Sequence, residues 1–280
     1  MKKWLIPVIV IIVLIVCAIS ATVVILLRPQ EENYGKYNDI TQWEDNYDSV
    51  PIDEVTTFTE GMHVYFGAYE QDNDKENGKE PIIWRVLDVQ DGKVLLLSEY
   101  VLDQINYNKK KTSVTWESCD LRRWLNSDFY EEAFSSTEQR RIVETELINK
   151  DNPVFGTDGG ENTKDYCFIL SIDEIEHYFN VKTTNQTDTL CSYCNYTIYN
   201  KARLAAPITA YANSVQAVYY KGTSKCKHIR YMGFWWTRTP GATSRQVAYI
   251  RGDSNILIKG DDVHFASAAV RPAIWVNINN

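Results

Sequence analysis

The chain of 280 residues contains 44% hydrophobic and 24% charged residues and carries a formal net charge of −8. This balance is typical of a globular protein and excludes a chain that is disordered throughout. The negative charge argues against a nucleic-acid partner, because phosphate binding needs a basic surface. The three consecutive lysines at 109–111 are interpreted as a solvated loop. The 18 Tyr and 8 Trp suit a tightly packed core or a binding surface.

Residues 4–27, WLIPVIVIIVLIVCAISATVVILL, contain no charged side chain. A helix of this length spans about 36 Å, enough to cross a hydrocarbon core about 30 Å thick. Lys2 and Lys3 precede the run, and the positive-inside rule therefore predicts a cytoplasmic N-terminus and an extracellular C-terminal domain. A cleaved signal peptide ending near residues 18–20 is the alternative, but the apolar run continues beyond that point. We therefore expect a single-pass anchor over residues 1–28, with the membrane as a partner through residues 4–27.

Residues 29–60 are rich in acidic side chains and show no amphipathic period. Such a stretch buries too little apolar surface to fold alone, and it is predicted to be a tether. Its Trp43 and the run Val50-Pro51-Ile52 leave open that part of it docks on the edge of the following domain. That globular domain is predicted to cover residues 61–280.

The first part of the domain is predicted to be β-rich. Residues 63–69 read as a strand, and residues 82–88 and 94–98 form a hairpin around the turn Asp91-Gly92. The second hairpin strand is continuously apolar, which favours burial on both faces.

Three helices are predicted to follow. Leu121, Trp124 and Leu125 share one helical face, with Thr115 or Ser118 as the cap. The pair Ser135 and Glu138 reads as a capping box that opens a helix reaching Glu146. A second capping box, Ser171 and Glu174, opens another helix after a short strand at 166–170.

The last third of the chain is predicted to be β again, with strands at 234–237, 246–250, 256–259 and 270–276. Strands, then helices, then strands indicate an α+β domain rather than a βαβ repeat.

Seven segments in order resemble one family: VYFGAYEQ, PIIWRVLDV, VLLLSEYVLDQINYN, TWESCDLRRWLN, FILSIDEIEHYF, FWWTRTPG and VRPAIWV. Together they resemble a domain of unknown function that recurs in secreted and membrane-anchored proteins of Gram-positive gut bacteria. The closing pattern is also similar to C-type-lectin-like and formylglycine-generating-enzyme-like domains, which implies a C-type-lectin-like architecture. The resemblance brings no established activity. Residues 188–194 and 223–230 depart from the family pattern and read as insertions.

Cys191, Cys194, Cys226 and His228 form the sharpest local constellation. Three thiols and an imidazole could hold a tetrahedral Zn²⁺, although their spacing matches no common zinc module. A disulfide among the three cysteines is the competing interpretation for an extracellular domain. Cys119 and Cys167, in a helix start and a strand, are expected to be plainly buried.

Trp236 and Arg238 share one face of a predicted strand and are the candidate ligand-binding residues. As an exposed pair they would stack on sugar rings or grip a carboxylate, whereas in the alternative interpretation they fill the core. Arg271 lies in an apolar strand and is expected to be structural, paired with a buried carboxylate.

Oxygen ligands for Ca²⁺ occur near two loop tips, although ordinary turn chemistry explains the same residues: Asp253, Asn255, Asp261 and Asp262. No nucleophile elbow, metalloprotease motif, P-loop or dinucleotide fingerprint is present in the sequence.

The favoured hypothesis is therefore a membrane-anchored cell-surface module that binds a glycan or protein. One alternative is an extracytoplasmic enzyme with a thiol or metal site around the four Cys and His residues named above. The other is a structural ectodomain of a membrane complex.

Overall fold

The computed structural model of the protein describes residues 48–183, 204–220, 232–264 and 268–279. Within these ranges the chain is a mixed α+β structure with many strands and few, short helices, as the α+β prediction requires. None of the described helices is long and apolar enough to cross a membrane. The predicted anchor at 1–28 lies outside the described residues.

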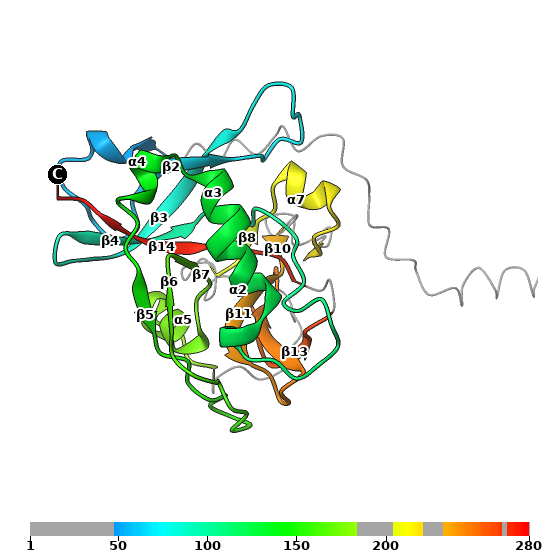
Figure 1. The fold of residues 1–280 in the computed structure, drawn as a ribbon. Coiled ribbons are helices and arrows are strands. Elements are labelled where there is room, and N and C mark those ends of the chain that lie inside the picture. The colour runs from blue at the N-terminus through cyan, green and yellow to red at the C-terminus, as the bar shows by residue number, and fades with distance from the viewer. Residues whose placement is uncertain (1–47, 184–203, 221–231, 265–267, 280) are drawn as a thin grey trace, which may run out of the picture. The chain divides into compact units, whose positions relative to one another are not determined.

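The central sheet has six strands in the order β1-β2-β3-β4-β14-β7. Its strands are β1 (Ser49–Pro51), β2 (His63–Tyr69), β3 (Glu80–Gln90), β4 (Lys93–Ser98), β7 (Cys167–Phe168) and β14 (Ala273–Asn277). Figure 1 shows β14, the last strand of the chain, lying beside β4, and its other neighbour in the sheet is β7. The N- and C-terminal parts of the domain are therefore joined through one sheet.

The predicted hairpin is confirmed. The strands β3 and β4 meet at Asp91 and Gly92, which both have positive φ (49° and 71°), as a two-residue type I′ turn needs. In β4, an inner strand between β3 and β14, every residue from Val94 to Ser98 is buried, although successive side chains point to opposite faces of the sheet. The prediction of a strand covered on both faces holds.

The segment before Gly61 does not lie wholly outside the fold. β1 pairs in parallel with β2, and Ile52 in the 3₁₀ turn η2 (Ile52–Glu54) is only 5% exposed. Asp53 forms an ion pair with Arg141 at 2.6 Å. Residues 49–54 therefore dock on the edge of the domain, which the sequence analysis left open beside the prediction of a tether.

A run of short helical turns follows the central hairpin: η3 (Trp116–Ser118), α2 (Asp120–Trp124), the π-helical turn η4 (Leu125–Phe129) and α3 (Tyr130–Ala133). Leu121 and Leu125 of the predicted apolar face are fully buried, as is Phe129, whereas Trp124 of that face is only partly buried. The cap prediction was wrong, because Cys119 Sγ accepts the Arg122 amide at 3.3 Å in place of Thr115 or Ser118.

The two predicted capping boxes both form, but they open helices of different length. Ser135 and Glu138 cap α4 (Ser136–Gln139), which ends after one turn; the expected extension to Glu146 was wrong. Residues 145–147 instead form β5, which pairs with β6 (Thr163–Asp165). Ser171 and Glu174 cap the full helix α5 (Ile172–Phe179), which ends at Asn180 in the left-handed conformation.

The C-terminal strands form two smaller sheets. β11 (Trp235–Pro240), β12 (Gln246–Ile250) and β13 (Ile256–Asp262) make one antiparallel meander. β8 (Ala206–Pro207), β9 (Tyr219–Tyr220) and β10 (Met232–Gly233) make the other, and α7 (Ala210–Ser214) lies between β8 and β9 in the chain. The backbone of Leu170 accepts the Arg238 amide at 3.1 Å, which joins β11 to the segment after β7.

Candidate functional site

Trp236 and Arg238, the candidate ligand-binding residues, are buried in the structure. Trp236 is fully buried, and its ring packs edge-on against Tyr107 and Tyr249 with centroids 6.0 and 6.1 Å away. Arg238 is 3% exposed. The expectation of an exposed pair was wrong because loops and helix α5 cover β11, so that even its end at Pro240 accepts a hydrogen bond from Asn152.

Arg238 is held by a set of oxygen acceptors. Its guanidinium pairs with both carboxylate oxygens of Glu174 and donates to Ile169 O at 2.9 Å and Asn149 Oδ1 at 3.2 Å. Glu174 also closes the capping box of α5 through the Ser171 amide. The Arg238–Glu174 pair therefore ties the first turn of a helix to a strand, which is a structural role.

Arg271 is fully buried, as predicted, in a second charge network. It donates to Ser98 O at 2.8 Å and lies over the Trp235 ring at 5.2 Å. In the same network, the Glu99 carboxylate accepts hydrogen bonds from two nitrogens of Arg85 at 2.7–2.9 Å. Its Oε2 atom lies 3.2 Å from His63 Nε2. Burial opposes ionisation, but the His63 hydrogen bond and the charges of Arg85 and Arg271 lower the pKa of Glu99 to about 2. The charge of Arg271 acts on the buried Glu99 carboxylate, and the direct ion pair expected for Arg271 stays a prediction.

The two described cysteines are buried and unpaired, as predicted. Burial raises the pKa of the Cys119 thiol to about 12 and also raises that of Cys167. A thiol that stays protonated at neutral pH is a poor nucleophile, so neither group suits catalysis. Cys191, Cys194, Cys226 and His228 lie outside the described residues, and the zinc or disulfide question stays a prediction.

The proposed Ca²⁺ ligands near the two loop tips serve the turns themselves. Asp253 pairs with Arg251 and accepts the amide of Asn255, while Asp262 pairs with Lys111. Among the described residues, three other carboxylates form a close group, with oxygen atoms within 4.8 Å of one another. They belong to Glu70, Asp72 and Glu80. Sequence reasoning missed this group, because its members flank an ordinary-looking polar loop.

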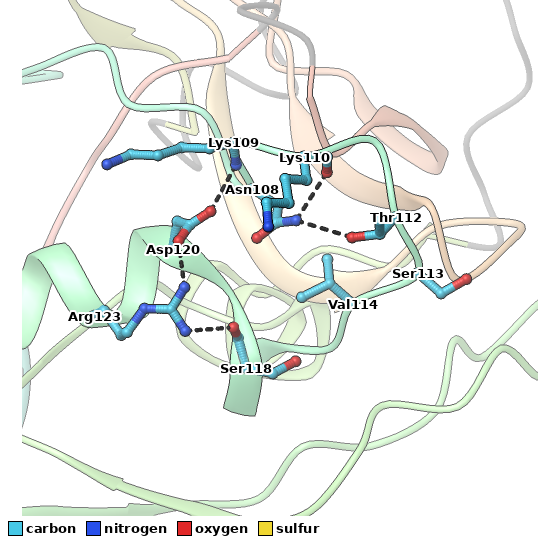
Figure 2. Close-up of a pocket in the computed structure, with 9 residues that line it drawn as sticks. All are labelled: Asn108, Lys109, Lys110, Thr112, Ser113, Val114, Ser118, Asp120 and Arg123. Carbon is cyan, nitrogen blue, oxygen red and sulfur yellow. Dashed lines mark hydrogen bonds and ion pairs between the residues drawn. The ribbon is translucent and has the colours of Figure 1, made fainter.

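A concave site of about 360 Å³ lies on the loop that leads into α2 (Figure 2). Its lining residues are almost all polar: Asn108, Lys109, Lys110, Thr112, Ser113, Val114, Ser118, Asp120 and Arg123. We call this site the 108–123 pocket. It includes two of the three lysines that the sequence analysis interpreted as a solvated loop.

Backbone and side-chain hydrogen bonds hold the shape of the 108–123 pocket. Figure 2 shows Asp120 accepting the Lys109 amide at 2.7 Å and pairing with Arg123, which also donates to Ser118 O. Asn108 Nδ2 bonds Lys110 O at 2.8 Å across the loop. The walls of the pocket are therefore preformed.

The rest of the domain anchors the same loop. The Asn108 amide donates to Val263 O, and the Val114 amide to Ser244 O, at 2.8 and 2.9 Å. Two lysines and an arginine contribute positive charge against the single carboxylate of Asp120. In a chain of net charge −8 this is a local positive site, able to attract a polar, negatively charged ligand.

Comparison with protein-family models matches residues 91–278 to the family described as "Domain of unknown function (DUF6273)". The match begins at the turn of the central hairpin and ends just after β14, so it includes the 108–123 pocket and both buried charge networks apart from His63 and Arg85. Neither a curated protein nor a solved structure matches the chain significantly. Because the family match covers more than half of the chain, the protein belongs to the DUF6273 family.

Proposed function

We propose that the protein is a membrane-anchored binding module of the cell surface and that the 108–123 pocket receives an anionic glycan. The supporting observation is the lining of the pocket, which offers hydroxyl, amide and cationic groups and one small apolar side chain, Val114. Such groups recognise a polar ligand through hydrogen bonds and charge rather than by burial of apolar area.

The sequence outside the pocket also supports this proposal. The uncharged run at 4–27 behind Lys2 and Lys3 supports a cytoplasmic N-terminus and an extracellular domain. The motif resemblance to C-type-lectin-like domains, and to proteins of Gram-positive gut bacteria, supports a glycan on a bacterial cell surface. These parts of the proposal rest on the sequence.

A binding role also agrees with the state of the reactive groups in the described part of the chain. The two thiols there are buried and protonated, and Arg238 and Glu99 are engaged in buried ion pairs. Each of these groups serves the packing of the domain, and the preformed pocket lies at the surface instead.

The test is a glycan-array screen followed by titration calorimetry on the purified protein. We expect hits that carry carboxylate or phosphate groups, with affinity falling as the salt concentration rises. Replacing Lys109 and Lys110 with alanine should weaken binding at least tenfold. Replacing the exposed Lys164 on β6 removes a similar charge elsewhere and should leave affinity unchanged. Preference for neutral glycans, or unchanged binding by the double variant, would refute the proposal.

A further inference from the structure

The loop between β2 and β3 brings three carboxylates together at its base. Glu70 directly follows β2, and Glu80 is the first residue of β3, paired across the ladder with Tyr69. Asp72 lies between them in the chain. Oxygen atoms of the three side chains all lie within 4.8 Å of one another. The register of the hairpin thus places three negative charges at one point.

Glu70 is the unusual member of this group. The residue is only 7% exposed, and its Oε1 atom is fully buried without a hydrogen-bond partner from the described residues. Buried carboxylate oxygens are normally bonded, because an unsatisfied one loses its hydration without replacement. Glu70 is one of the three clustered carboxylates, and its buried Oε1 atom, without a bond from the described residues, points to a missing positive partner.

Neighbouring side chains do not supply that partner within the described ranges. None of the three carboxylates forms an ion pair with a lysine or arginine there. Lys79, the nearest lysine in the chain, pairs with Glu132, and Lys75 lies over the Tyr211 ring.

The other two carboxylates are already oriented. Asp72 accepts the Asp74 amide and the Asn77 side chain, each at 2.7 Å. Glu80 Oε2 accepts the amides of Gln71 and Asp72 at 2.6 and 3.2 Å, so both of these bonds to the carboxylate fall on one oxygen. Gln71 O in turn accepts the Tyr211 amide of α7 at 2.9 Å, which fastens the loop to the domain.

We infer that Glu70, Asp72 and Glu80 bind a divalent cation of the Ca²⁺ class. Carboxylates alone are hard oxygen ligands, which suit Ca²⁺ and Mg²⁺ rather than Zn²⁺. Ca²⁺ accepts irregular geometry and mono- or bidentate carboxylates, as an oxygen set gathered from a loop and two strand ends provides. Mg²⁺ instead demands a near-ideal octahedron. The ion would connect both ends of the loop and satisfy Glu70 Oε1.

Calorimetric titration of the full chain, stripped of metal with EDTA, tests this site with CaCl₂ and MgCl₂ as the probes. We expect one Ca²⁺ per chain, a weaker response to Mg²⁺, and a melting temperature that rises by several degrees in Ca²⁺. Glu70→Gln keeps the shape of the side chain and removes its charge, and it should weaken Ca²⁺ binding at least tenfold. Glu146→Gln, an equal charge loss at an exposed position on β5, should bind Ca²⁺ as the wild type does.

The metal-free Glu70→Gln variant should fold, since it relieves repulsion in the cluster; circular dichroism checks this. If it does not fold, Asp72→Asn, in the exposed part of the loop, replaces it, and this variant should also weaken Ca²⁺ binding at least tenfold. Absence of Ca²⁺ binding at millimolar concentration, or wild-type affinity in the folded variant, would overturn the site. Tighter binding of Mg²⁺ than of Ca²⁺ would overturn the assignment of the ion.

Discussion

Replacing Arg238 with alanine should destabilise the domain strongly. The change removes the guanidinium that pairs with the Glu174 carboxylate and donates to Ile169 O and Asn149 Oδ1. Removing one partner of a buried ion pair costs about 3–5 kcal/mol. The Glu174 side chain is 26% exposed, so water recovers part of its solvation, and we expect about 3 kcal/mol. This is a large fraction of a typical domain stability of about 5–15 kcal/mol.

Urea unfolding followed by tryptophan fluorescence measures this loss, and calorimetry should show a melting temperature lower by about 6–12 °C. Arg140→Ala is the matched control. Arg140 is exposed and its guanidinium donates to Thr137 Oγ1 of helix α4, so removing this side chain should cost less than about 1 kcal/mol. If Arg238→Ala costs no more than this control, the Arg238–Glu174 pair does not hold α5 on β11. The reasoning would then be refuted, and Arg238 would return as a ligand candidate.

Three further predictions concern stability. The pKa of Glu99 is lowered from 4.5 to about 2 in the folded protein, so Glu99 should contribute about 3 kcal/mol above pH 4.5 that is lost as the pH falls toward 2. Unfolding measured from pH 6 to pH 2.5 should show this loss in the wild type and much less of it in Glu99→Gln; a flat wild-type profile contradicts it. A fragment of residues 48–280 should be more stable than one of residues 61–280 by about 1.5–3 kcal/mol, because Ile52 is buried, and equal denaturant midpoints would show that β1 adds nothing. Gly67→Ala should destabilise by more than about 1 kcal/mol, because φ is +68° and an added Cβ would lie 2.7 Å from Ala133 O, whereas Gly78→Ala has open space and tests the effect of positive φ alone.

Local signals in the sequence predicted most of the strands and two of the helix starts. The Asp91-Gly92 turn permits the left-handed backbone that a two-residue hairpin needs, and the two capping boxes satisfy their own amides within four residues. Such features depend on contacts that are close in the chain. The α+β class follows from the order of these elements, and it holds in the structure.

Features that depend on distant contacts were missed. The helix after Ser135 ends early because residues 145–147 pair with residues 163–165, which no local pattern reveals. Trp236 and Arg238 were candidates for an exposed pair because they share one strand face, but Asn152 from another segment covers the end of that strand. The burial of a side chain is a property of what packs over it, and this is decided by the tertiary fold.

The 108–123 pocket and the carboxylate cluster at the base of the β2–β3 loop both depend on the tertiary fold. Lys109 and Lys110 are exposed, as the interpretation of a solvated loop requires, but the fold of the loop onto α2 places them with Asp120 and Arg123 around one pocket. Glu70 and Glu80 are ten positions apart in the chain, and only the β2–β3 register brings their carboxylates together. Composition and spacing determined the elements of this protein, whereas the pairing of strands decided which charged groups meet, because electrostatic contacts act through space over a few ångströms and not along the chain.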